Sequence, residues 1–220
     1  MIITIDGPAG SGKSTAARHL AERLGLAYLD TGAMYRAVTL RALRQEVDLT
    51  DGDALTHCAA GAALSLRYDD GRLRVLLDGQ DVSEAIRSVE VTDNSHYLAS
   101  TPGVRDVLVA LQRRAAGDLG DVVTEGRDQG SVVFPDATVK FFLVADPDVR
   151  ARRRYDELRA KGQDVGFDAV RDAMAARDRR DAGRDVAPLV RPDGAIEVDT
   201  TGLSIEQVID VLARHVEAAR

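Results

Sequence analysis

The sequence predicts an α/β fold built on a central parallel sheet. Short apolar segments of strand length alternate with longer helical segments. A glycine-rich loop joins the first strand to the first helix, and the same alternation returns in the second half of the chain. A strand, helix, strand, helix order of this kind forms parallel sheets with right-handed crossovers.

The amino-terminal part establishes the alternation. Residues 2–5 read as a buried strand, and a helix follows from about residue 12 to 24, ending near Gly25. Residues 26–29 read as a second strand and residues 33–45 as a helix. Farther on we expect two short strands at 64–68 and 72–77, around the hairpin signal Asp69-Asp70-Gly71.

The alternation then resumes to the end of the chain. We expect a helix at 104–115 and strands at 122–125 and 139–144. Asp146-Pro147 opens the next helix, which ends near Lys161. A helix at 167–182 and a strand at 196–198 follow, and Ser204 with Gln207 forms a capping box for the final helix.

Composition bounds the function. The 220 residues are 45% hydrophobic, enough for one large core with inserts, and no apolar run reaches membrane-spanning length. The first strand leaves no room for a signal peptide, so we expect a cytosolic protein, and the single Cys58 cannot form an internal disulfide. A net charge of −7 argues against nucleic-acid binding as the main task.

The predicted organisation is a core with two inserts. The core comprises residues 1–30, 98–149 and 185–220, and the inserts are 31–97 and 150–184. The second insert carries 11 basic and 7 acidic residues on an otherwise acidic protein. This basic segment indicates either a binding site for a compact anion or a solvated helical surface with many ion pairs.

The loop after the first strand predicts a nucleoside triphosphate site. It matches G-x-x-x-x-G-K-[ST] at every fixed position, with the residues Gly7, Pro8, Ala9, Gly10, Ser11, Gly12, Lys13, Ser14 and then Thr15. Its backbone N–H groups and the following helix end favour phosphates, Lys13 can reach the β- and γ-phosphates, and Ser14 can ligate Mg²⁺. We therefore expect ATP with Mg²⁺. The absence of N-K-x-D argues against a GTPase, and the absence of a strand ending in Asp-Glu argues against a hydrolytic motor.

Three further clusters indicate a second substrate. Thr31 and Arg36 follow the second strand, and Arg127 and Asp128 follow another, where strand ends line the crevice of a parallel sheet. Arginines there suit a second phosphate, and Asp128 suits a sugar hydroxyl or Mg²⁺. The third cluster shares one helical face and comprises Arg177, Arg180, Asp181 and Arg184. The alternative is an exposed helix residue for Arg36, a salt bridge in a turn for Arg127 and Asp128, and a structural ion-pair network for the third cluster. Arg150, Arg153 and Arg154 share another helical face, and we expect that face to cover the triphosphate.

Together these residues resemble the bacterial cytidylate kinases, CMP/dCMP kinases of the nucleoside monophosphate kinase family of P-loop proteins. The matching stretches span nearly the whole chain: TIDGPAGSGKST, LDTGAMYRA, DGQDVSEAIRS, EGRDQGSVVFPDA, RDVAPLV and LSIEQVI. The resemblance implies a P-loop three-layer α/β/α core that holds ATP. Residues 31–97 would be a monophosphate-binding insert with short antiparallel strands, and 150–184 a helical lid.

By position, the resemblance implies a role for each site residue. Phosphate contacts of CMP would come from Thr31, Arg36, Arg127 and Arg184, with Tyr35 packed nearby. Asp128 and Arg177 would hold the ribose, and Arg105 and Asp181 would recognise cytosine. A carboxylate can accept a hydrogen bond from the 4-amino group of cytosine. The family's base-contacting serine aligns with His96, and the adjacent Ser95 is the alternative. Lys13, Arg127, Arg153 and Arg184 would act in catalysis, and Arg150 and Arg154 would contact ATP.

The expected reaction is transfer of the γ-phosphate of ATP to CMP or dCMP by a monomeric enzyme of pyrimidine metabolism that binds neither nucleic acid nor membrane. None of the four histidines lies in a motif with a triad partner, and a phosphate acceptor needs no general base. One alternative is a related kinase that acts on UMP, AMP or a small hydroxyl compound. A hydroxyl acceptor would need a base, and Asp128 is the candidate. The other alternative is a nucleotide-binding module without turnover.

Overall fold

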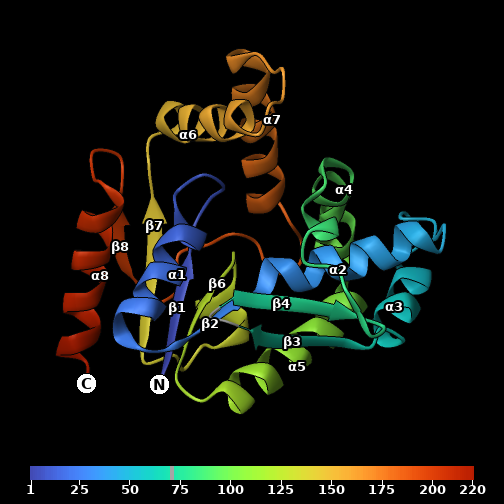
Figure 1. Ribbon diagram of the computed structural model, residues 1–220, viewed down its shortest axis with the longest axis horizontal. Coiled ribbons are helices and arrows are strands. Elements are labelled where there is room, and N and C mark those ends of the chain that lie inside the picture. Colours follow the sequence, from blue (N-terminus) through green and yellow to red (C-terminus); the bar gives the residue numbers. More distant parts are fainter. Residues whose placement is uncertain (70–71) are drawn as a thin grey trace. The chain divides into compact units, whose positions relative to one another are not determined.

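The computed structural model describes residues 1–69 and 72–220, and the chain divides into two compact units (Figure 1). The first unit comprises Met1–Tyr28 and Asp121–Arg220, and the second comprises Leu29–Gly120. Most of the phosphate-binding residues predicted above lie in the first unit, and the residues predicted to hold the acceptor are divided between the two.

A five-stranded sheet has the strand order β2-β6-β1-β7-β8. Its strands are β1 (Ile2–Asp6), β2 (Ala27–Asp30), β6 (Val122–Glu125), β7 (Val139–Val144) and β8 (Ile196–Asp199). The pairings of β1 with β6, β1 with β7 and β7 with β8 are all parallel. Because β1 has a neighbour on each side, Ile3 and Ile5 are fully buried. The predicted central parallel sheet is confirmed.

Two helices of the first unit pack together on this sheet. They are α1 (Lys13–Leu24) and α8 (Ile205–Ala218), and their apolar faces share one core with β1 and β7. Leu20 and Leu212 are fully buried there. The predicted capping box of Ser204 and Gln207 opens α8.

The segment at the carboxyl end of the strands is helical as well. A short π-helical turn, η2 (Gln129–Val133), follows β6. Helices α6 (Pro147–Ala160) and α7 (Phe167–Ala182) follow β7 (Figure 1). The Asp146 side chain caps α6, with Pro147 as its first residue, as the sequence predicts. Val170 and Met174 of α7 pack on Ala151 of α6.

The second unit combines α-helices with a small antiparallel sheet. Its helical elements are α2 (Thr31–Arg44), α3 (Gly52–Ala60), the short 3₁₀ turn η1 (Ala85–Arg87), α4 (Val89–Ser100) and α5 (Pro102–Leu119). The strands are β3 (Leu64–Asp69), β4 (Arg72–Leu77) and β5 (Gln80–Asp81), and both pairings are antiparallel. The two predicted strands are confirmed, but the predicted turn at Asp69-Asp70-Gly71 includes positions outside the described residues.

Some helix boundaries differ from those expected. Helix α2 begins at Thr31, two residues early, because the Asp30 carboxylate accepts the N–H of Ala33 at 2.8 Å and caps the first turn. Helix α5 begins at Pro102, where a proline costs no backbone hydrogen bond. It is grouped with the second unit, in which it packs on α3 and α4. The division of the chain by role into core, insert and lid stays a prediction.

Two negative findings apply to the described part of the chain. In residues 1–69 and 72–220, no helix is long and apolar enough to cross a membrane. Over those same residues, no group of three or more histidine, cysteine, aspartate or glutamate side chains is arranged to hold a metal ion by itself.

Candidate active site

The phosphate loop connects β1 to α1 in the first unit, in the context that the motif requires. Gly7 has a φ of 144°, and a Cβ added there would lie 2.1 Å from the Leu143 carbonyl oxygen of β7. No other residue fits this close approach. The tight passage of Gly7 against β7 turns the chain so that the loop leads directly into the amino-terminal end of α1.

Lys13 is the buried cation of the loop. Its Nζ donates to the Pro8 carbonyl oxygen at 2.6 Å, across the loop. Burial, followed by the charge of Arg127, lowers the pKa of Lys13 from 10.5 to about 7, although Glu125 opposes the shift. An amine that is poorly solvated and faces other cations is ready to receive a polyanion.

Nucleotide binding is therefore expected to be coupled to protonation of Lys13. Phosphate oxygens beside the amine raise its pKa again, so ADP binding at about pH 8 takes up between about half and one proton. Titration calorimetry in two buffers of different ionisation enthalpy measures this uptake. Lys13→Arg stays charged at this pH and provides the control. Equal uptake by both proteins would contradict the assignment.

Ser14 and Glu125 form a pair of oxygen donors beside the loop. The Ser14 hydroxyl donates to Glu125 Oε1 at 2.8 Å, and Glu125 is the last residue of β6. Mg²⁺ in phosphoryl-transfer sites takes oxygen ligands, usually one or two from the protein and the others from phosphates and water. The two residues fit such an ion when a triphosphate supplies further ligands.

Asp6 joins the phosphate-loop side of the sheet to the segment after β6. Its two carboxylate oxygens accept the consecutive backbone N–H groups of Gln129 and Gly130 at 2.8 and 2.7 Å. Burial raises the pKa of Asp6 from 3.8 to about 6, and these two hydrogen bonds limit the rise. The start of η2 is thereby fixed, and with it the preceding residue Asp128, which is buried.

Arg127, Asp181 and Arg184 form a compact ion cluster. The Arg127 Nε lies 2.8 Å from Asp181 Oδ2, and Arg184 pairs with Oδ1 of the same carboxylate. Asp181, on α7, is only 3% exposed. Burial works to raise the pKa of Asp181, but the charges of Arg127 and Arg184 outweigh it and hold that pKa below its usual value. The cluster carries two arginines for one carboxylate, so it retains positive charge for an anion.

Other predicted arginines lie around this cluster and the loop. Arg177 adds to the electrostatic shifts at both Lys13 and Asp181. Arg150 contacts the loop carbonyl of Ala9, and Arg153 contacts Thr200. Arg154 pairs with Glu157 of its own helix.

The second unit contains the predicted site residues Thr31, Tyr35, Arg36 and Arg105, which contact one another or neighbouring residues within that unit. Arg36 pairs with the helix-capping Asp30 at 3.1 Å, and Thr31 is buried beside that cap. Arg105, also buried, donates to the Tyr35 hydroxyl at 3.2 Å. This contact brings together two residues that are 70 positions apart in the sequence.

The side chains of Ser95 and His96 each contact a backbone carbonyl oxygen of their own helix, α4. The Ser95 hydroxyl donates to the Thr92 carbonyl oxygen at 2.8 Å, and His96 Nδ1 lies 2.6 Å from the Asp93 carbonyl oxygen. The His96 ring also packs on Tyr97, with 4.1 Å between the ring centroids. Each side chain is thus oriented by its own helix, and which of them meets a base stays a prediction.

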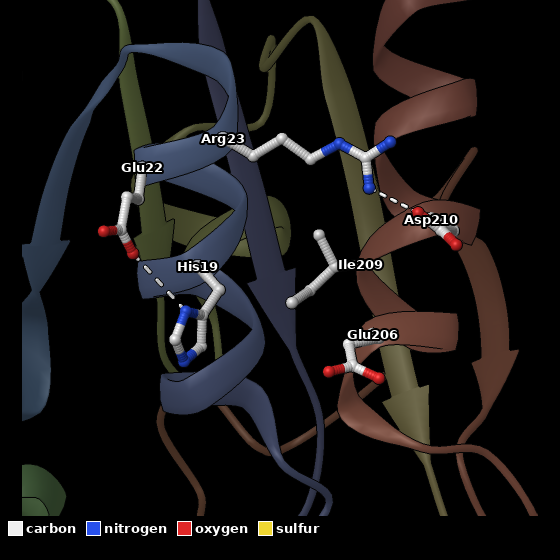
Figure 2. A pocket seen from close by; sticks show the side chains of 6 residues that line it. All are labelled: His19, Glu22, Arg23, Glu206, Ile209 and Asp210. Carbon is white, nitrogen blue, oxygen red and sulfur yellow. Dashed lines mark hydrogen bonds and ion pairs between the residues drawn. The ribbon is translucent and has the colours of Figure 1, made fainter.

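A pocket elsewhere in the first unit contains none of the predicted site residues. It lies between α1 and α8 and is lined by His19, Glu22, Arg23, Glu206, Ile209 and Asp210. Figure 2 shows that His19 points toward Glu22 on one side and Arg23 toward Asp210 on the other. Within this pocket, His19 pairs with Glu22 and Arg23 pairs with Asp210.

Sequence reasoning missed Asp6, Asp30 and Thr200 as functional candidates. Asp6 stands directly before the loop at a strand end, which is a usable signal. Asp30 stands directly before α2, where an aspartate is a helix-cap signal. Thr200 gave no signal, because its partner in the loop is 189 positions away.

Comparisons of this sequence with known proteins give matches over nearly the whole chain. A sequence model for the family described as cytidylate kinase matches residues 3–218. A protein named cytidylate kinase from Geobacter sulfurreducens is 47% identical over 96% of this chain and 90% of its own length. Another of that name, from Corynebacterium glutamicum, is 47% identical over 100% of this chain and 95% of its own. Among solved structures, an uncharacterized protein from Eubacterium ventriosum covers 99% of this chain and 98% of its own, with a TM-score of 0.52 and 14% identity, which supports the fold alone.

Proposed function

Because the chain belongs to the cytidylate kinase family, we propose that it transfers the γ-phosphate of ATP to CMP or dCMP, giving ADP and CDP or dCDP. It would be a phosphotransferase with a phosphate group as acceptor. The observation that carries the proposal is the buried Lys13, which faces the loop carbonyl of Pro8 beside the positive cluster of Arg127 and Arg184. A cationic site of this kind suits two phosphorylated substrates.

On the donor side, the loop and Lys13 would hold the triphosphate. Backbone N–H groups of the phosphate loop, which Pro8 lacks, would bind the β-phosphate, while Lys13 would neutralise charge on the transferred group. Ser14, held by Glu125, would ligate Mg²⁺, which supplies charge neutralisation between the phosphates when bound. Arg154 would cover the triphosphate from α6.

On the acceptor side, the phosphate of CMP would meet Thr31, Arg36, Arg127 and Arg184. Tyr35 would pack nearby, and its hydroxyl accepts a hydrogen bond from Arg105, which is proposed to contact the base. Asp128 and Arg177 would hold the ribose. Asp181 would accept from the cytosine 4-amino group while still paired with its arginines, because each carboxylate oxygen has more than one acceptor site.

The proposed reaction places no demand on a general base. The attacking group is a phosphate oxygen of CMP, which is largely ionised at neutral pH because its second pKa is about 6. The protein's task is to bring two polyanions into line and to neutralise their repulsion. Lys13 and the Arg127–Asp181–Arg184 cluster would do so from fixed positions.

A panel of acceptors tests the function. With ATP and Mg²⁺, a coupled assay is expected to give higher kcat/KM for CMP and dCMP than for UMP or AMP. Asp181→Ala is expected to reduce the preference for CMP over UMP more than it reduces ATP binding, with Asp164→Ala, an exposed aspartate after α6, as control. A preference for AMP or for a hydroxyl acceptor would contradict the proposal, and nucleotide binding without transfer would indicate a binding module. We expect a cytosolic monomer.

A further inference from the structure

Two carbonyl groups of the phosphate loop are held by side chains outside the loop. The Ala9 oxygen accepts from Arg150 Nη1 at 3.0 Å, and the Ser11 oxygen accepts from the Thr200 hydroxyl at 3.2 Å. A trans peptide group is planar, so its N–H points away from its C=O. Fixing these two carbonyls therefore fixes the direction of the next N–H groups, at Gly10 and Gly12, which belong to the motif that grips phosphates.

Arg150 is built into the protein as an anchor for the loop. Besides Ala9, its guanidinium donates to the Ala145 carbonyl oxygen at 3.1 Å and pairs with Asp178 of α7 at 2.5 Å. The residue is only 7% exposed. Ala9 also packs in a small apolar cluster with Ala151 and Met174, so α6 and α7 contact the loop directly. The planar fork of arginine matches this set of acceptors, whereas lysine offers a single nitrogen.

Arg153 reaches the same loop through an intermediary. Its two terminal nitrogens donate to the Thr200 hydroxyl at 3.0 Å and to the Thr200 carbonyl oxygen at 2.6 Å. Because its oxygen accepts from Arg153, the Thr200 hydroxyl is left to donate toward the Ser11 and Val144 carbonyl oxygens, each at 3.2 Å. Arg150 and Arg153 lie one helical turn apart on α6, so one helix turn holds the loop at two points.

We propose that Arg150 and Arg153 are positioning residues, which shape the phosphate loop from behind instead of contacting the triphosphate. Their guanidinium groups hold the carbonyls of Ala9 and, through Thr200, Ser11, and the adjacent N–H groups then face the nucleotide. This inference rests on the nucleotide-binding half of the proposed function. It concerns binding at the loop and does not depend on which monophosphate is the acceptor.

The test compares ADP with ATP. The loop N–H groups bind phosphates that both nucleotides have, so Arg150→Met and Arg153→Met are each expected to weaken ADP and ATP by the same factor, on the order of tenfold. Titration calorimetry without acceptor measures both affinities. CMP affinity, measured in parallel, is expected to stay unchanged. Loss of ATP affinity with retention of ADP affinity would overturn the proposal, since it would indicate direct contact with the γ-phosphate.

Thr200→Val isolates the indirect route without changing any charge. Valine has nearly the shape of threonine but lacks the hydroxyl that joins Arg153 to Ser11. If Arg153 acts through Thr200, Thr200→Val weakens ADP by the same factor as Arg153→Met, and the double variant is no weaker than either single variant. Additive losses would overturn the route through Thr200.

Arg159→Met is the matched control on the same helix. Arg159 is half-exposed and pairs only with Asp164 among the ion pairs seen in the described residues, so its removal is expected to leave both affinities unchanged. Thermal unfolding without nucleotide separates loop positioning from loss of the fold. If Arg150→Met does not fold, the Arg153 and Thr200 variants still decide the proposal. A wild-type protein that binds ADP but fails to phosphorylate CMP would contradict the proposed function and leave this inference standing.

Discussion

Replacing Lys13 by alanine is expected to lower kcat/KM for phosphoryl transfer by about three orders of magnitude. Its amine is the buried cation of the loop, and burial holds it without a hydration shell until phosphates arrive. A preorganised charge of this kind stabilises a transition state at no reorganisation cost. The coupled assay with ATP and CMP measures the loss. A fall in kcat as well as a rise in KM for ATP would locate the effect in the chemical step.

The same variant is expected to keep its fold. Because the folded-state pKa of Lys13 lies below 10.5, burial of the protonated amine costs stability, and this cost grows as the pH falls from 10.5 to about 7. Alanine removes that cost together with the hydrogen bond to Pro8. Thermal unfolding without nucleotide is expected to show no loss of stability. Lys161→Ala, which removes an exposed lysine paired with Glu157, is the control and is expected to retain full activity. An active Lys13→Ala would refute the role of the loop.

Arg127→Met is expected to lower the stability of the fold and to weaken binding of the acceptor CMP. Asp181 is buried and would keep only Arg184 of the two arginines now in direct contact with its carboxylate, so unfolding free energy is expected to fall by roughly 3 kcal/mol at neutral pH. KM for CMP is expected to rise at least about a hundredfold, because one of the proposed ligands of the CMP phosphate is lost. Chemical denaturation and steady-state kinetics with CMP measure the two effects. Since the pKa of Asp181 lies below its usual value, the stability difference is expected to shrink as the pH falls through the range in which aspartates protonate.

A second substitution separates the two effects. Asp181→Asn removes the buried charge, so in combination with Arg127→Met it is expected to recover part of the stability but none of the CMP affinity. Arg171→Met, an exposed arginine on α7 paired with Asp168, is the control. A stability loss in Arg127→Met with unchanged KM for CMP would restrict Arg127 to a structural role.

The sheet and the loop could be predicted because their signals are local. Each buried strand is a short apolar run, and Gly25, Asp146 and Ser204 mark helix ends by their own conformational or side-chain chemistry. Helix α4 could not be found in this way. Its sequence is rich in Val, Thr, Asp, Asn and Ser, which have low helix propensity. The helix forms because Ser88 caps it and α2 and α5 pack against it.

At the candidate site, the sequence predicted which residue types gather at strand ends but not what each one contacts. Arg150 and Arg153 were expected at the triphosphate, and the structure places their guanidinium groups on the carbonyl of Ala9 and on Thr200. Ala9 is 141 positions from Arg150, a separation at which no local pattern reports contact. The ion cluster of Arg127 and Asp181 joins residues 54 positions apart and was likewise beyond spacing arguments.

The close packing around Gly130 has a consequence for how this sequence can vary. A methyl group at this position would lie 2.8 Å from the Thr4 hydroxyl and 3.0 Å from Pro192 Cγ, while the backbone N–H stays bound to Asp6. Alanine would fit without a shift of its neighbours only if smaller residues stood at positions 4 and 192. The order of mutations would therefore matter. A lineage that acquires alanine at position 130 last passes through intermediates with a small void, and the reverse order passes through a protein with a displaced η2. Positions 4, 130 and 192 are expected to be inherited as a linked set.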